Sequence, residues 1–169
     1  MARFFVVGDA TVDQMYFVEA LPESGGEVTA RRSLMQPGGA GGTVAAALAW
    51  LGNDVRIATR VGQGPFAELA LTNLVSAGVD LSLLQRDTER QTSSVTLLVT
   101  PDTQRTMISA IGASRYLDAA QLQPEHVAAA DAVVMSAYSL VAGPQREYAV
   151  KTLEYARPEG VTTFLDMGS

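Results

Sequence analysis

Short apolar runs alternate with helix-like segments along the chain. Phe4–Val7 is solidly apolar and ends at Gly8, which is typical of a strand buried on both faces. The Ala- and Leu-rich segment Thr43–Leu51 predicts a helix that Gly52 ends in the left-handed conformation. The alternation continues with strands at 55–61, 132–135 and 161–165 and helices at 66–77, 124–130 and 145–156. Buried strands that alternate with helices predict an α/β fold, with a largely parallel sheet flanked by helices.

Two other pairs of extended segments are half polar, unlike the strands that are buried on both faces. The first pair lies on either side of the turn 22–26, and the second surrounds the turn at Pro101, a residue suited to the second turn position. We therefore expect these pairs to stand outside the main sheet as a small β lid. In this division the core comprises 1–13, 36–91 and 111–169, and the lid comprises 14–35 and 92–110.

Composition narrows the possible partners. The chain has 169 residues, 47% hydrophobic, with a net charge of -6 and no Cys. A sequence pI near 4.7 argues against a nucleic-acid or anionic-membrane surface, because both require clustered Lys and Arg. The absence of Cys excludes disulfides, thiolate metal sites and a cysteine nucleophile. The first apolar run is too short for a signal peptide, and no stretch approaches the roughly 18 apolar residues of a membrane span, so we expect a cytoplasmic protein without a membrane partner.

Two features near the first strand could carry chemistry. Asp13 follows that strand by a few residues, and ligands of open α/β sheets bind beyond the carboxyl ends of strands. Its two carboxylate oxygens could bridge neighbouring sugar hydroxyls, although Asp9 and Asp13 could equally form turns or caps. The glycine-rich segment 38–42 could bring backbone N–H groups against a polar ligand or serve only as a connector. It lacks the Gly-Lys-Ser/Thr of a P-loop, and no Gly-x-Gly-x-x-Gly follows the first strand, which argues against NAD binding.

Several motifs in order give the chain a specific resemblance. They are Gly8-Asp9-Ala10-Thr11-Val12-Asp13, the stretch Pro37–Gly52, Arg60-Val61-Gly62, Ala77-Gly78-Val79-Asp80, and the pair 92–99 and 105–107 followed by Gly112-Ala113. Together they resemble the ribokinase-like carbohydrate kinases of the PfkB family, over essentially the whole chain. The resemblance implies a ribokinase-like fold and ATP-dependent transfer of phosphate, with Mg²⁺, to a hydroxymethyl group of a sugar or nucleoside.

The resemblance also implies roles for particular residues. Asp13 would hold substrate hydroxyls, Thr11 would meet the substrate, and the backbone of Gly38 and Gly39 would line the same pocket. Thr43 takes the position at which the family signature usually has Asn, and it reaches less far. The lid would exclude water from the sugar, and in relatives such lids also form dimer contacts, so a homodimer through the lid is one possible partner. Further departures from the family pattern are Gly64, Ser93 and Ser114, where Asp, Gly and Asn are common.

The largest departure is an absence. The family's catalytic base lies in a Gly-Ala-Gly-Asp motif of the second half, and this motif and its adenine pocket do not occur here. We therefore expect no catalytic residue and no metal ligand in this chain, and no turnover by the chain alone. Asp166 resembles a family segment that approaches the phosphates from a strand end, but it could simply end a strand. The last strand has no closing helix, so we expect an exposed sheet edge and an incomplete domain.

Two alternatives remain open. The first is a non-catalytic sugar- or nucleoside-binding domain of the same fold, which Thr43 and Gly64 favour. The second is a Rossmann-like oxidoreductase, which the exit of the first strand and the lid pairs disfavour. Nothing in the sequence identifies which sugar or nucleoside would be bound.

Overall fold

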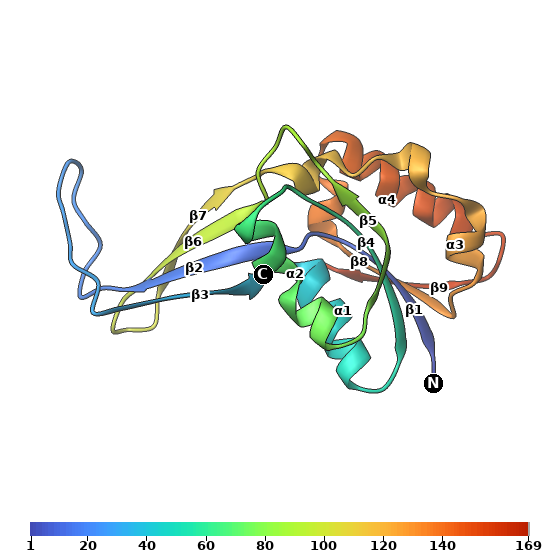
Figure 1. Ribbon diagram of the computed structural model, residues 1–169, viewed down its shortest axis with the longest axis horizontal. Helices are drawn as coiled ribbons and strands as arrows, with labels where there is room; N and C mark the ends of the chain where they lie inside the picture. Colours follow the sequence, from blue (N-terminus) through green and yellow to red (C-terminus); the bar gives the residue numbers. More distant parts are fainter. Residues whose placement is uncertain (169) are drawn as a thin grey trace.

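Five parallel strands form the main sheet of the computed structural model, which describes residues 1–168 (Figure 1). Their order across the sheet is β5-β4-β1-β8-β9. The bounds are Arg3–Val7 for β1, Asp54–Val61 for β4, Asp80–Arg86 for β5, Ala132–Ser136 for β8 and Thr162–Asp166 for β9. Every neighbouring pair runs parallel, which confirms the parallel α/β sheet predicted from the alternation of apolar runs and helices.

Helices cover both faces of this sheet, and the alternating side chains of β1 separate two cores. Val6 packs in one core with buried residues of α1 (Ala40–Trp50) and α2 (Pro65–Ser76). Phe5 and Val7 point the other way and pack in a second core with α3 (Pro124–Ala128) and α4 (Gly143–Ala156). Because successive strand residues point to opposite faces, a short apolar run such as 4–7 must be buried on both sides.

A second, four-stranded sheet extends from one end of the main sheet (Figure 1). Its strands are β2 (Thr11–Phe17), β3 (Arg32–Gly38), β6 (Ser94–Val99) and β7 (Arg105–Ala110), in the order β3-β2-β6-β7. The two predicted pairs are present as antiparallel hairpins, but they are not independent. Strand β2 pairs in parallel with β6, with Asp13 opposite Val95, so the hairpins form one sheet.

The boundaries of this second sheet differ from those expected. Strand β2 begins at Thr11 and β3 runs to Gly38, so residues 11–13 and 36–38 belong to it. Helix α1 already begins at Ala40, which leaves Gly39 as the junction where a longer glycine loop was expected. The small residues allow close packing here, since a Cβ on Gly41 would lie 2.6 Å from the Cα of Gly8.

Strand β5 was not predicted. Its sequence mixes Leu with polar residues and has no β-branched residue, so neither periodicity nor propensity marks it as a strand. It lies at the sheet edge and is mostly half-buried, and its pairing with β4 selects the extended conformation. Tertiary pairing here outweighs a weak local preference.

The opposite sheet edge, β9, is exposed along its whole length. Phe164 and Leu165 are 54% and 46% exposed, although both are large and apolar. The expected uncovered edge is therefore present within the described residues.

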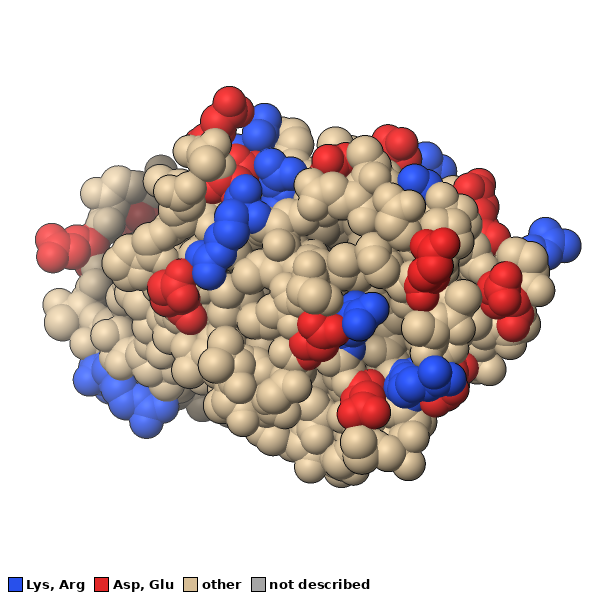
Figure 2. Space-filling model, turned by 45° about the vertical axis from the view of Figure 1, so that its right-hand side comes forward, with Lys and Arg blue, Asp and Glu red and all other residues tan. Residues whose placement is uncertain are grey.

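Charged side chains of both signs share the surface. Figure 2 shows acidic and basic side chains interspersed on the face in view, many of them beside a partner of opposite charge. Exposed pairs of this kind, such as Arg3 with Asp131, contribute little to stability. Within residues 1–168, no helix combines the length and apolar character needed to cross a membrane.

Candidate sugar-binding site

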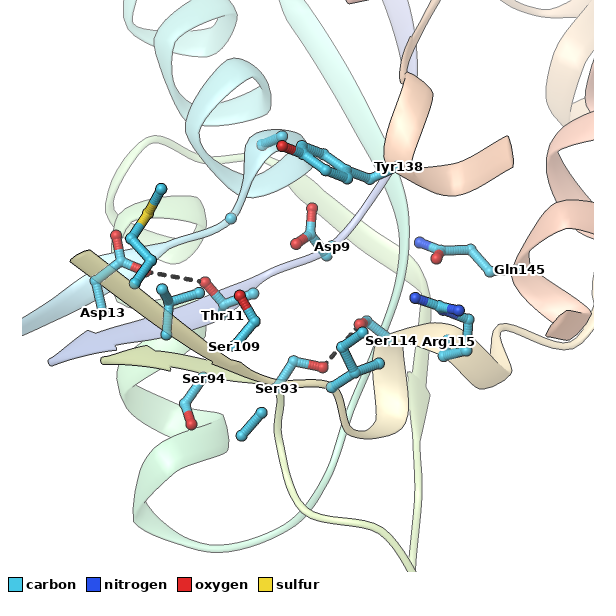
Figure 3. Close-up of a pocket in the computed structure, with 16 residues that line it drawn as sticks. Asp9, Thr11, Asp13, Ser93, Ser94, Ser109, Ser114, Arg115, Tyr138 and Gln145 are labelled. Carbon is cyan, nitrogen blue, oxygen red and sulfur yellow. Dashed lines mark hydrogen bonds between the residues drawn. The ribbon is translucent and has the colours of Figure 1, made fainter. Parts of the chain in front are cut away.

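A cavity of about 310 Å³ lies where the two sheets meet, beyond the carboxyl ends of β1 and β8 (Figure 3). Its polar lining comes from segments far apart in the sequence: the β1–β2 connection, β2, the start of α1, β6, β7, the short 3₁₀ helices 113–116 and 137–140, and the start of α4. The polar or charged residues that line it are Asp9, Thr11, Asp13, Ser93, Ser94, Ser109, Ser114, Arg115, Tyr138 and Gln145. The location agrees with the rule that open α/β sheets bind ligands beyond the carboxyl ends of their strands.

Asp13 presents its carboxylate to this cavity from strand β2. The Thr11 hydroxyl donates a hydrogen bond to Asp13 Oδ1 at 3.2 Å. Gly38 lies on the paired strand, and any Cβ there would collide with the Asp13 carboxylate, so glycine provides the space that this carboxylate occupies. Burial raises the pKa of Asp13 above its ordinary value; the hydrogen bond from Thr11 opposes the rise, and the nearby Asp9 adds to it. The result is a half-buried acceptor with one oxygen already oriented.

The junction between β3 and α1 forms the adjoining wall. Gly39 has φ of +90°, and a Cβ on it would lie 2.6 Å from the carbonyl oxygen of Asp9. The N–H of Gly42 donates to that carbonyl at 2.8 Å, and the N–H of Gly41 donates to Asp9 Oδ1 at 3.4 Å. The start of α1 is thereby joined to the loop after β1, and Gly39 and Ala40 face the cavity.

Not all residues proposed from the sequence reach this cavity. Thr11, Asp13 and Gly39 line it. Gly38 does not line it, but lies against the Asp13 carboxylate. Thr43 is exposed on α1 and lies beside a different, very small crevice together with Asn73. Asp166 ends the exposed strand β9 opposite Ser136, and its carboxylate accepts the N–H of Gly168 at 3.0 Å. Thr43 and Asp166 are therefore not brought together with Asp13.

Sequence reasoning missed part of the cavity wall. Ser93 and Ser114 were noted only as departures from a family pattern, yet their hydroxyls lie 2.7 Å apart in the wall, and Ser93 Oγ accepts the N–H of Gly112 at 3.0 Å. Tyr138 follows the carboxyl end of β8 by two residues. This position after a buried strand was the signal from which the sequence could have placed it at the site. Arg115 and Gln145 had none, since only the tertiary structure brings them to the cavity.

Comparison with known proteins agrees with this architecture. The match to the family described as pfkB family carbohydrate kinase covers residues 1–167. An Escherichia coli (strain K12) protein named as an uncharacterized sugar kinase is 31% identical over 163 residues, covering 96% of this chain and 49% of that protein. An Escherichia coli fructokinase is 40% identical over 94 residues, covering 56% of this chain and 27% of the relative.

A solved structure supports the same fold. Arabidopsis thaliana ribokinase, complexed with ribose and ATP, superposes with a TM-score of 0.83 at 22% identity, over 99% of this chain and 54% of the other. The fold and the cavity between two sheets thus define the ribokinase-like class. Within it, the chain belongs to the pfkB family of carbohydrate kinases. It spans about half the length of the relatives that match it over nearly its whole sequence.

ATP and Mg²⁺ are the groups that this family implies, and the described residues can be compared with what each group requires. Within residues 1–168, His, Asp and Glu side chains do not gather in any group of three that could hold a metal ion. The cavity volume lies at the lower end of the range for small-ligand pockets, which suits a sugar and a phosphate group better than a sugar and a whole nucleotide. The residues present therefore do not fit Mg²⁺ or the adenosine part of ATP.

Proposed function

We propose that this chain supplies the sugar-binding half of an ATP-dependent sugar kinase, with the second sheet as a lid over the sugar. The observation that carries the proposal is the half-buried Asp13 carboxylate, which Thr11 orients at one end of the cavity between the two sheets. A carboxylate there accepts hydrogen bonds from two neighbouring hydroxyls, an arrangement that polyols provide and most metabolites do not.

The remaining wall suits a polyhydroxylated ligand. Ser109 presents a hydroxyl that can both donate and accept, and Met107 and Val95 present apolar surface from the same face of the sheet. A lid of this kind excludes water, which protects a transferred phosphate from hydrolysis. We propose that the general base lies outside this chain, so that the chain alone binds sugar without turnover.

Ligand-dependent stabilisation tests the proposal directly. The chain is heated with and without fructose, ribose and other neutral pentoses and hexoses, with glycerol at equal concentration as the control. A sugar at about 100 times its Kd stabilises the folded state by about 2.7 kcal/mol, which is a rise in Tm of roughly 5–10 °C for a chain of this size. A panel in which no sugar raises Tm more than glycerol would contradict the proposal.

Sugar binding should also depend on pH through Asp13. The ionised carboxylate is the hydrogen-bond acceptor, and its pKa is raised by burial. Affinity for a neutral sugar should therefore fall as the pH is lowered, with a midpoint above the ordinary value of 3.8. Calorimetric titrations from pH 7 to pH 4 measure this, and Asp13→Asn should bind weakly with no such pH dependence. An affinity that stays constant to pH 4 would show that Asp13 is not the acceptor.

A further inference from the structure

The end of the cavity opposite Asp13 carries a positive charge. Figure 3 shows Asp13 on one side, and Arg115 and Gln145 together on the other, with their polar ends directed at the intervening space. Among the described residues that line the cavity, Arg115 is the only cation, and the two carboxylates are Asp9 and Asp13. The cavity is therefore polarised, with a hydroxyl-binding end and a cationic end.

Arg115 differs from most other arginines of the chain in having no carboxylate partner. The following arginines each pair with a carboxylate at 2.6–3.3 Å: Arg3, Arg31, Arg56, Arg60, Arg86 and Arg90. Within residues 1–168 the Arg115 guanidinium forms neither an ion pair nor a hydrogen bond, although the side chain is half-buried. A partly desolvated guanidinium with its donors unused is well suited to receive an anionic oxygen.

The surroundings hold Arg115 in this orientation. Its Cγ and Cδ lie against Gly143 at the start of α4, where a Cβ would come within 3.0 Å of both atoms. Gln145, 5% exposed, is fixed by a chain of hydrogen bonds in which its Nε2 donates to Ser139 Oγ at 3.4 Å and Ser139 Oγ donates to the carbonyl of Val7 at 3.5 Å. The cationic end is thus attached to the carboxyl end of β1 and to α4.

We infer that Arg115, with Gln145 beside it, binds an anionic oxygen group at this end of the cavity. The inference deepens the proposed function and depends on it for the sugar at the other end. The anionic group has two possible sources: a carboxylate or phosphate on the sugar itself, or a phosphate of the nucleotide. Arg115 therefore determines either which sugars bind or how the phosphate donor is held.

The test measures ligand binding to the parent chain, Arg115→Gln and Arg115→Lys by calorimetry. The ligands are a neutral sugar that binds the parent chain, gluconate as a sugar acid, ribose 5-phosphate, a non-hydrolysable ATP analogue and inorganic phosphate. Arg115→Gln should lose at least tenfold in affinity for the anionic ligands of one source, and its affinity for the neutral sugar should be unchanged. Arg115→Lys should lose less, because it keeps the charge but not the two-pronged donor geometry. Arg146→Gln is the matched control, since Arg146 follows Gln145 on α4, is exposed and does not line this cavity.

The pattern of losses identifies the source. A loss confined to gluconate and ribose 5-phosphate assigns the anion to the sugar, and a loss confined to the ATP analogue assigns it to the donor. In parallel, the Nε–H resonance of Arg115, assigned by its absence in Arg115→Lys, should shift saturably with inorganic phosphate in the parent chain. This readout requires neither a sugar nor a folded Arg115→Gln.

Two results would overturn the inference: equal affinities of the parent chain and Arg115→Gln for every anionic ligand, or an Nε–H resonance that no anion shifts. If neutral sugars fail to bind while phosphate still shifts this resonance, the proposed function fails and the anion site stands. If neutral sugars bind and no anion depends on Arg115, the anion site fails and the proposed function stands.

Discussion

Replacing Asp13 with alanine is expected to reduce the affinity for sugar by at least about 100-fold. The physical reason is that a carboxylate accepts charge-assisted hydrogen bonds worth about 1.5–3 kcal/mol each, and two neighbouring hydroxyls would lose theirs together. Thr11 would also lose the acceptor that its hydroxyl contacts at 3.2 Å. Calorimetric titration of the parent chain and Asp13→Ala with the same neutral sugar measures the loss.

Two controls separate this effect from misfolding. Asp13→Asn keeps the shape of the side chain and one acceptor oxygen, so it should bind more weakly than the parent chain and more tightly than Asp13→Ala. Asp54→Ala removes an exposed carboxylate at the amino end of β4, away from the cavity, and should leave affinity unchanged. Affinity of Asp13→Ala within threefold of the parent chain would refute the role assigned to this carboxylate.

Replacing Asp87 with alanine should lower the free energy of unfolding by about 2–3 kcal/mol, because it removes a buried carboxylate, and hydrogen bonds to a charged group contribute about 1.5–3 kcal/mol. Asp87 is only 2% exposed, and its Oδ1 accepts the N–H groups of Glu89 and Arg90, both at 2.9 Å. Its Oδ2 accepts from Arg60 Nε at 3.0 Å and from Arg90 at 3.3 Å. Truncation would leave these partly buried donors without their acceptor.

This carboxylate also links folding to the cavity. Arg90 stacks over the ring of Tyr116 at 3.8 Å, next to Arg115 in the chain. The segment that Asp87 begins continues to Thr92, whose hydroxyl accepts the N–H of Gly62 at 3.1 Å, and then to Ser93 in the cavity wall. Loss of Asp87 should therefore loosen the wall as well as destabilise the fold.

Acid should weaken the stabilisation that the Asp87 carboxylate provides. Burial alone would raise the pKa of Asp87, but the N–H groups of Glu89 and Arg90 and the charge of Arg60 outweigh burial and lower the pKa to about 2. Because the folded-state pKa lies below the ordinary value of 3.8, the stabilisation is complete above that value and is lost as the pH falls toward 2. By linkage this portion amounts to about 2 kcal/mol.

Urea unfolding at pH 7 and at pH 2.5 measures both effects. Asp87→Asn, which retains an acceptor without charge, should be less stable than the parent chain at pH 7 and should lose less on acidification. Glu159→Ala is the control, because Glu159 is an exposed carboxylate that forms no ion pair and no side-chain hydrogen bond within residues 1–168. An Asp87→Ala chain within 1 kcal/mol of the parent at pH 7 would show that the buried pair does not stabilise the fold.

Local sequence patterns predicted most elements of the fold because the signals are local. The apolar run at residues 4–7 marks a strand buried on both faces, and the Ala-rich segment after Gly42 has high helix propensity. Both signals can be read from a few neighbouring residues. Strand β5 was missed because its extended conformation depends on pairing with β4 at the sheet edge and not on its own sequence. Thr43 was placed in the pocket by motif position, but on α1 it lies in the exposed stripe with Ala47 and Trp50, at helical spacings of four and three residues.

By itself the sequence determined the α/β class, the two half-polar hairpins, and an Asp placed beyond the first strand with glycines beside it. These follow from periodicity, from the conformational freedom of glycine and from the chain direction of a buried strand. Only the tertiary structure decided that β2 and β6, about 80 residues apart, pair into one sheet, and that Arg115 and Gln145 face Asp13 across one cavity. Such pairings depend on the free energy of long-range contacts, and no local pattern of residues records which distant segments will meet.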